Sequence, residues 1–320
     1  MIFNKFFILF KIGRKIGKSN IINIVSETHK IPVFIKLFFN LLAFSFSGSN
    51  DTKNKGKENL SASIQEMGTT FIKLGQFLAT RPDIIGEKLS KELESLQDKL
   101  PPFSKKEAEK IIIENLGQSN FDDIIDLSDP IAAASIAQVH KAKIKDDNII
   151  KNVAIKVLRP DIKKIFNDEI DAIMLLAYIV ESLITKTKRL KLIEVVFLFK
   201  EITNHEMDLR FEAAAANEYA ENTKNDLGFF VPKIYWNFTS ESVLTLDWVD
   251  GVSIREKDLL KEKNIETSKI ASNLIQHFLR HAVRDGFFHA DMHQGNIFIN
   301  ESSQIVPIDF GIMGRIDKLS

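Results

Sequence analysis

The feature that most constrains the fold of this 320-residue chain is a pair of polar motifs near its carboxyl end. HADMHQGN places Asp291 five residues before Asn296, and PIDFG places Asp309 thirteen residues after Asn296. Aspartate and asparagine oxygens are the hard ligands that Mg²⁺ prefers. A separate aspartate can orient or deprotonate an attacking hydroxyl or water. The two motifs together therefore predict a magnesium-dependent catalytic site.

The order and the spacings of these motifs match the catalytic set of protein kinases. In that interpretation His289 holds the loop, and the role of His293 stays open. The alternation of His289, Asp291 and His293 also allows a transition-metal site, which is the competing interpretation.

A second group of residues suits phosphate binding. Lys156 closes the apolar strand VAIK, from which a lysine can reach nucleotide phosphates. Upstream, immediately before a predicted hairpin, lie the small residues of a candidate phosphate loop, Ala132, Ala133, Ala134 and Ser135. Small side chains let backbone N–H groups approach phosphate oxygens, although alanine resists the positive φ that glycine accepts. Each signal taken alone is also typical of ordinary packing.

A kinase-like site needs an acid to pair with the strand lysine, and HEMDLRFEAAAANEY offers Glu206, Asp208 and Glu212. On one continuous helix Glu206 and Glu212 would be turned about 240° apart, so they would serve different partners. Lys73 of FIKLGQ is the second lysine available. The alternative is that these acids form a solvated helix face.

The periodicity predicts helices before and after a central hairpin. A capping box at Ser104 and Glu107 starts one helix, which ends at Gly117. The predicted helices cover about 60–78, 88–99, 104–117, 161–187, 192–222 and 268–285, and the predicted strands cover 137–144, 152–158 and 243–251.

The first forty residues are basic and rich in phenylalanine, and Phe3, Phe6, Phe7 and Phe10 recur at helical spacing. Such a helix can lie on an anionic membrane surface or pack on the domain. The polar stretch 47–59 reads as a linker, and the apolar run 37–46 is too short to span a membrane. The absence of cysteine excludes disulfides and thiol catalysis. Balanced charge, 43 basic against 43 acidic residues, gives no field that attracts nucleic acid.

Over residues 61–317 the chain resembles the UbiB family of atypical protein-kinase-like proteins. The resemblance rests on K-x-G-Q at Lys73, Gly75 and Gln76, on AAAS at 132–135, on E-x-D at Glu206 and Asp208, and on QDKLPPF. It implies an α+β fold, namely a two-lobed protein-kinase-like fold with an α-helical N-terminal extension. The expected segments are 1–58 (basic helix and linker), 59–128 (extension), 129–250 (N-lobe with a helical insertion) and 251–320 (partial C-lobe).

The resemblance implies a role for each matching residue. Lys156 would hold the α- and β-phosphates with Glu212 as its partner, and Asp291 would be the catalytic aspartate. Asn296 and Asp309 would bind Mg²⁺. In a further group, Lys73 and Gln76 would lie over the nucleotide pocket near Glu206 and Asp208, where they would block protein substrates.

The family resemblance also implies ATP or ADP as cofactor and ATPase or kinase activity. The activity would support ubiquinone biosynthesis at the cytoplasmic face of a membrane, with lipid intermediates or other ubiquinone-biosynthesis proteins as partners. The older association with a polyprenylphenol hydroxylation step finds no hydroxylase motif here. Two departures lie in the catalytic loop, where Met292 and Gln294 replace usual prolines. The chain also ends soon after DFG, so we expect a C-lobe that is incomplete.

Two other functions compete with this interpretation. A small-molecule kinase would share the catalytic aspartates but would lack K-x-G-Q. The presence of K-x-G-Q in this sequence therefore speaks against that function. A pseudokinase-like scaffold would bind the nucleotide for structural reasons alone, and measured phosphate release separates it from an enzyme.

Overall fold

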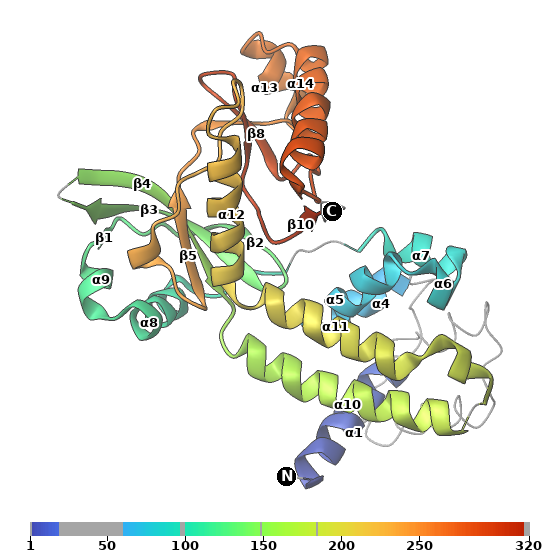
Figure 1. Ribbon diagram of the computed structural model, residues 1–320. Helices are drawn as coiled ribbons and strands as arrows, with labels where there is room; N and C mark the ends of the chain where they lie inside the picture. Colours follow the sequence, from blue (N-terminus) through green and yellow to red (C-terminus); the bar gives the residue numbers. More distant parts are fainter. Residues whose placement is uncertain (1, 19–59, 97–99, 148, 184, 317–320) are drawn as a thin grey trace. The chain divides into compact units, whose positions relative to one another are not determined.

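The computed structural model describes residues 2–18, 60–96, 100–147, 149–183 and 185–316, which form an α+β protein (Figure 1). Its α-helices are α1 (Ile2–Lys18), α4 (Leu60–Met67), α5 (Thr69–Ala79), α6 (Pro82–Ile85), α7 (Glu87–Leu93), α8 (Lys105–Leu116), α9 (Gln118–Asp122), α10 (Ile162–Leu183), α11 (Leu192–Glu206), α12 (Leu209–Thr223), α13 (Lys257–Glu262) and α14 (Thr267–Arg280). Short helical turns are η1 (Thr185–Leu190), η2 (Trp236–Phe238) and the π-helical η3 (His281–Asp285). The strands are β1 (Ile124–Ile125), β2 (Pro130–Ala133), β3 (Ala137–Asp146), β4 (Ile149–Leu158), β5 (Val243–Asp247), β6 (Gly251–Ser253), β7 (Phe287–His289), β8 (Ile297–Asn300), β9 (Ile305–Pro307) and β10 (Met313–Arg315).

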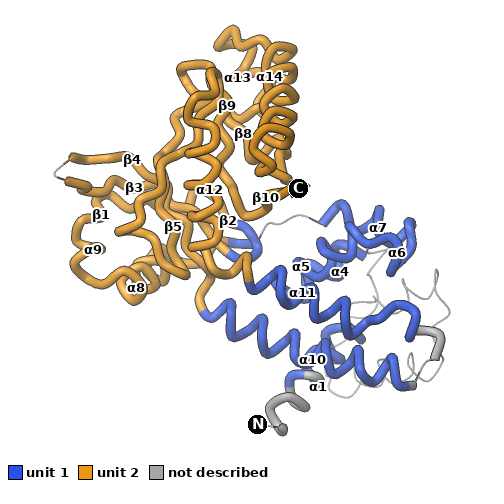
Figure 2. Tube along the Cα trace, in the orientation of Figure 1, with its two compact units in different colours: residues 1–101, 134–136, 161–204 blue, residues 102–133, 137–160, 205–320 orange. Residues whose placement is uncertain are grey.

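The chain divides into two compact units (Figure 2). The first comprises residues 1–101, 134–136 and 161–204, and the second comprises residues 102–133, 137–160 and 205–320. Helices α8 and α9, which the sequence assigns to the helical extension, belong to the second unit. The predicted linker 47–59 and the apolar run 37–46 lie outside the described residues.

In the first unit, the predicted amphipathic helix forms as α1 and packs on its own domain. Ile12 is buried with Met67 and Phe71, and Ile8 and Ile16 flank this cluster. The side chains of Phe3, Phe6 and Phe7 lie outside the described set. No described helix combines the length and apolar character that crossing a bilayer requires. Attachment of α1 to a membrane surface stays a prediction.

The predicted helix 60–78 is in fact two helices. Gly68 separates α4 from α5 with a φ of 101°, a conformation that favours glycine. Helical periodicity continues on both sides of this residue, which is why the pattern alone predicts one helix. Further along α5, Gly75 brings the backbone against Leu96 and Ile64, so the glycine of K-x-G-Q serves close packing.

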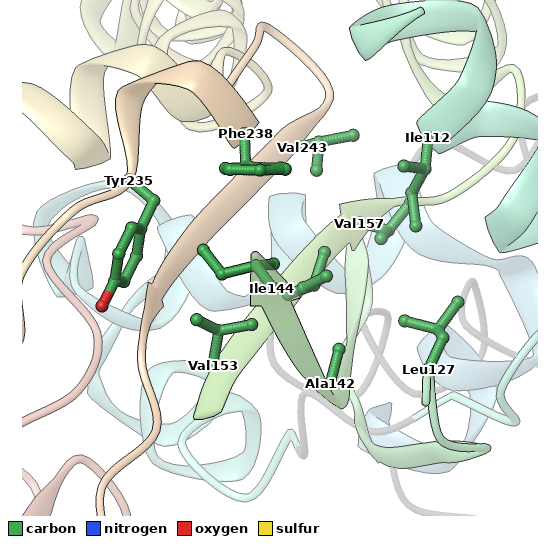
Figure 3. Packing of buried hydrophobic residues seen from close by; sticks show 10 residues of the cluster. Ile112, Leu127, Ala142, Ile144, Val153, Val157, Tyr235, Phe238 and Val243 are labelled. Carbon is green, nitrogen blue, oxygen red and sulfur yellow. The ribbon is translucent and has the colours of Figure 1, made fainter. Parts of the chain in front are cut away.

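The second unit is built on an antiparallel sheet in the order β1-β3-β4-β5, and β2 pairs with the other end of β3. The β3–β4 hairpin runs two residues further than predicted at the end of β3 and begins three residues earlier in β4. One face of the sheet packs under α8, where Ile112 meets Val157, Val243 and Phe238 (Figure 3). Because side chains alternate along a strand, Val153, Ile155 and Val157 face this core and Lys156 faces away from it.

The predicted helix 192–222 is also wrong as a single element. It breaks after Glu206, and α12 begins at Leu209. Asp208 lies in extended conformation and accepts a hydrogen bond from the backbone N–H of Arg210, as an N-cap residue does. The angle predicted for Glu206 and Glu212 on one continuous helix therefore does not apply, since the two acids belong to different helices.

Candidate functional site

The centre of the candidate site is a buried ion pair between a sheet and a helix. Lys156 of β4 lies between Val139 of β3 and Leu244 of β5. Its Nζ donates to both carboxylate oxygens of Glu212, at 2.9 and 2.8 Å. Glu212 lies in the first turn of α12, and only 7% of its side chain is exposed. The structure thus brings together the lysine and the acid that the sequence proposes as partners.

Asp309 is the third charged group at this centre. Its Oδ2 lies 3.4 Å from Lys156 Nζ, and its Oδ1 accepts from the backbone N–H of Gly311. The Lys156 charge lowers the pKa of Asp309 against the opposing effect of burial. Burial by itself would lower the pKa of Lys156, but the charges of Asp309 and Glu212 outweigh it and raise that pKa. Lys156 is therefore a fixed positive charge at neutral pH.

Glu212 has the opposite balance. Burial raises the pKa of its carboxyl, while the Lys156 charge acts to lower it. The backbone N–H of Phe310 also points at this carboxylate, at 3.4 Å. Helix α12 is thus joined through one side chain to both β4 and the DFG segment.

His289 connects the catalytic loop to the DFG segment. Its Nε2 donates to the backbone carbonyl of Asp309 at 2.6 Å, and its Nδ1 accepts from the backbone N–H of Asp291 at 3.1 Å. These two bonds define a neutral imidazole, and burial lowers the pKa of His289 accordingly. The predicted loop-holding role of His289 agrees with these contacts.

Asn296 and Asp291 are brought together by the same loop. Asn296 Nδ2 donates to the backbone carbonyl of Asp291 at 3.2 Å and approaches its Oδ2 at 3.4 Å. The Asn296 carbonyl accepts from the backbone N–H of Ile308, next to Asp309. Because the amide nitrogen is the donor, its side-chain oxygen is the atom suited to a metal. Asn296 and Asp309 thus supply the hard-oxygen set that fits Mg²⁺.

The competing transition-metal site does not form. Both ring nitrogens of His289 are bonded to the backbone, and His293 Nδ1 accepts from the backbone N–H of Gly295. Among the described residues, the metal-ligand types that converge within 4.8 Å are instead Asp226, His277 and His281.

The candidate phosphate loop is partly a strand. Ala132 and Ala133 belong to β2 and pair with Val139 and Gln138. The sequence had predicted a loop for these two residues. Ala134 and Ser135 group with the first unit, where the Ser135 carbonyl accepts from Thr69 Oγ1 of α5. Their contact with a phosphate stays a prediction.

The remaining predicted site residues belong to different compact units of the chain. Lys73 and Gln76 are half-buried on α5 in the first unit. Glu206 ends α11 and Asp208 caps α12 in the second unit, where Asp208 also pairs with Arg210 at 2.6 Å. Pairing of Lys73 with these acids stays a prediction.

The sequence reasoning missed a polar cluster beneath the hairpin. The side chain of Gln138, fully buried in β3, accepts from the backbone N–H of Phe103 and also bonds His140 at 2.9 Å. His140 Nδ1 in turn bonds the Ser128 carbonyl. These bonds tie the PPF stretch to β3, and alternation places Gln138 and His140 on one face of the strand.

Four buried histidines predict a loss of stability in mild acid. Burial lowers the pKa of His140, His277, His281 and His289. The unfolded chain therefore binds more protons than the folded one below about pH 6.5, and the free energy of unfolding should fall as pH falls. The raised pKa of Glu212 acts in the opposite direction, because it stabilises the folded state as pH falls. It is one group against four histidines. Urea midpoints should be lower at pH 5.5 than at pH 8, and His277→Leu should flatten the dependence. Equal midpoints at both pH values would contradict the prediction.

The sequence comparisons find close family relatives. The ABC1 atypical kinase-like domain matches residues 95–320. "Probable protein kinase UbiB" of Marinobacter nauticus is 35% identical over 292 residues, which cover 90% of this chain and 52% of the relative. The protein of the same name in Pseudomonas aeruginosa is 30% identical over 314 residues, which cover 96% of this chain and 58% of the relative. The chain thus spans a little over half the length of these curated relatives.

One solved structure is similar to this chain in its fold. The complex of Rv3197 with erythromycin from Mycobacterium tuberculosis is similar with a TM-score of 0.52 and 25% identity. The similarity covers 76% of this chain and 59% of that chain. The predicted kinase-like α+β fold is confirmed.

Proposed function

Because this chain belongs to the ABC1 atypical kinase-like family, we propose that it binds ATP or ADP with Mg²⁺ around Lys156 and Asp309. The observation that carries the proposal is the charge arrangement at Lys156. One lysine is held by Glu212 at 2.8 Å and faces Asp309 at 3.4 Å. A protein kinase needs this lysine–glutamate pair and the DFG aspartate in place at the same time.

In this function Lys156 binds the α- and β-phosphates as a fixed positive charge. Asn296 and Asp309 would hold Mg²⁺, which would neutralise charge on the phosphates. Asp291 orients the attacking hydroxyl or water and accepts its proton. His289 fixes the backbone of Asp291 relative to Asp309, so the loop is ordered before the nucleotide binds.

We also propose that the activity is that of an atypical kinase or ATPase supporting ubiquinone biosynthesis. This part rests on the similarity to relatives named protein kinase UbiB. A hydroxylase role has no support in the residues of the site. The physiological acceptor would be a lipid intermediate or a protein of that pathway, and the place of action a membrane surface.

Calorimetric titration with ADP tests nucleotide binding. We expect saturable binding in Mg²⁺ and at least about tenfold weaker binding in EDTA, because Asn296 and Asp309 would hold the metal that neutralises phosphate charge. Equal heats with and without Mg²⁺, or no binding in either, would contradict the proposal. Phosphate release from ATP then separates an enzyme from a scaffold.

A further inference from the structure

Helix α12 touches the candidate site at two points on one side. Glu212 and Tyr219 are seven residues apart, which is close to two helical turns, so both side chains project in nearly the same direction. Glu212 reaches Lys156, and Tyr219 is completely buried against the ring of Phe310 from the DFG segment. The function proposed above uses Glu212 but gives no role to Tyr219.

The hydroxyl of Tyr219 belongs to a buried chain of hydrogen bonds. It lies 2.6 Å from Nδ1 of His281, whose Nε2 lies 2.9 Å from Oδ2 of Asp226. A carboxylate only accepts, so His281 Nε2 carries the proton and Nδ1 accepts from Tyr219. Burial raises the pKa of Tyr219, which keeps the hydroxyl protonated as the donor.

The chain is closed at both ends. Arg284 donates to both oxygens of Asp226, at 2.7 and 2.9 Å, which fixes the carboxylate that orients His281. At the other end, the ring of Tyr219 lies edge-on to the ring of Phe287 in β7, with the ring centroids 6.2 Å apart. Strand β7 ends at His289, whose ring joins the Asp291 backbone to the Asp309 carbonyl. Helix α12 is thereby connected to η3 by hydrogen bonds and to β7, which leads into the catalytic loop, by a ring contact.

The local backbone explains how the chain forms. His281 and Arg284 lie in the π-helical turn η3, which follows α14 and ends at Gly286 in the left-handed conformation. Such turns are rare and occur often at functional sites. Here the turn directs both side chains toward Asp226, which lies just beyond the end of α12.

The same residues do not suit a metal ion, although Asp226, His277 and His281 have ligand types. Both nitrogens of His281 are already bonded, and Arg284 occupies both oxygens of Asp226. Arg280 adds a second positive charge 3.9 Å from Asp226. A divalent cation would have to displace these bonds beside two guanidinium groups. The ring of His277 instead packs in a tilted arrangement against Phe229, with the ring centroids 5.0 Å apart.

We propose that Tyr219, His281 and Asp226 are positioning residues that anchor α12 to η3, the turn that leads through β7 into the catalytic loop, and so keep Glu212 paired with Lys156. In protein kinases the placement of the corresponding helix controls this pair. In this protein a buried polar anchor two turns from Glu212 holds the helix. The effect on nucleotide binding rests on the proposed function, whereas the ordering of α12 does not.

Tyr219→Phe tests the anchor because it removes one hydroxyl and keeps the ring. Tyr235→Phe is the matched control: the ring of Tyr235 is buried in the sheet core, and its hydroxyl donates to the carboxylate of Asp247 at 2.7 Å. Hydrogen exchange of amides 209–223 is measured without nucleotide. We expect about threefold to tenfold faster exchange in Tyr219→Phe, the size of one net hydrogen bond, and unchanged exchange in Tyr235→Phe.

The second measurement is a double-mutant cycle on Mg²⁺·ADP affinity. Tyr219→Phe should weaken binding by about threefold to tenfold in the parent and have little further effect in a Glu212→Gln background. Additive effects, or unchanged exchange in α12, would overturn the anchor. Stoichiometric binding of Zn²⁺ that is lost in His277→Leu would overturn it as well, by assigning the cluster to a metal. If the parent does not bind nucleotide, the proposed function fails, and hydrogen exchange still decides the anchor.

Discussion

Replacing Asp309 with asparagine is expected to remove most of the magnesium-dependent nucleotide affinity while the protein stays folded. The amide is neutral and is a weaker ligand for Mg²⁺ than a carboxylate. Loss of an outer-shell partner of a metal typically weakens binding about 10- to 100-fold, so loss of a direct ligand should weaken it at least that much. Calorimetry with ADP in Mg²⁺ and in EDTA measures the difference.

The fold should tolerate this change for reasons visible at the site. Asparagine keeps the side-chain oxygen that accepts from Gly311, and Lys156 keeps both bonds to Glu212. Asp129→Asn, an exposed site before β2, is the matched control for the loss of one negative charge. If Asp309→Asn bound Mg²⁺·ADP as tightly as the parent, the metal assignment would be wrong. If it lost the thermal transition of the parent, the role of Asp309 would be structural.

Much of the centre of this site could be predicted because its parts carry local signals. VAIK, the H-x-D-x-x-x-x-N loop and DFG each combine a secondary-structure pattern with chemistry that tolerates few residue types. The pattern alone offered three acids for Lys156; the family resemblance singled out Glu212, and the structure shows this pair. The loop-holding role of His289 was predicted from its place in the motif, but the partners of its two ring nitrogens were not.

The helix breaks could not be predicted in the same way. Hydrophobic periodicity runs through Gly68 and through Met207–Asp208, so the pattern favours continuous helices. The break at Asp208 depends on its extended backbone and on its bond to the N–H of Arg210. Aspartate is a good N-cap residue, but it also occurs on exposed helix surfaces, so the residue type alone does not decide.

The anchor of α12 is invisible in sequence for a different reason. Tyr219 and His281 are 62 positions apart, and His281 and Asp226 are 55 apart. No local periodicity relates them, and each residue type is common in an ordinary core. Only the fold brings the end of α12 beside the π-helical turn, which itself has no simple sequence signal. Polar networks joined over such distances are what sequence reasoning misses in this protein.

Replacing Asp291 with asparagine should reduce turnover at least about a hundredfold and leave nucleotide binding intact. The backbone of Asp291 is held by His289, and its side chain is 41% exposed. Asparagine keeps the shape and the contact with Asn296, but it cannot accept a proton at neutral pH. General-base catalysis contributes about a hundredfold to ten-thousandfold, so phosphate release should fall by that factor.

A second variant, at the neighbouring His293, distinguishes the effect of Asp291 from that of the residues around it. His293 lies 3.8 Å from the Asp291 carboxylate and is largely exposed, so His293→Gln should change phosphate release by much less. Mg²⁺·ADP affinity, measured on the same preparations, should stay near the parent value in both variants, because neither residue belongs to the proposed metal pair. Undiminished turnover in Asp291→Asn would show that another group takes the proton. Binding without turnover in the parent itself would favour a nucleotide-binding scaffold, since Lys156, Asn296 and Asp309 would then serve the nucleotide alone.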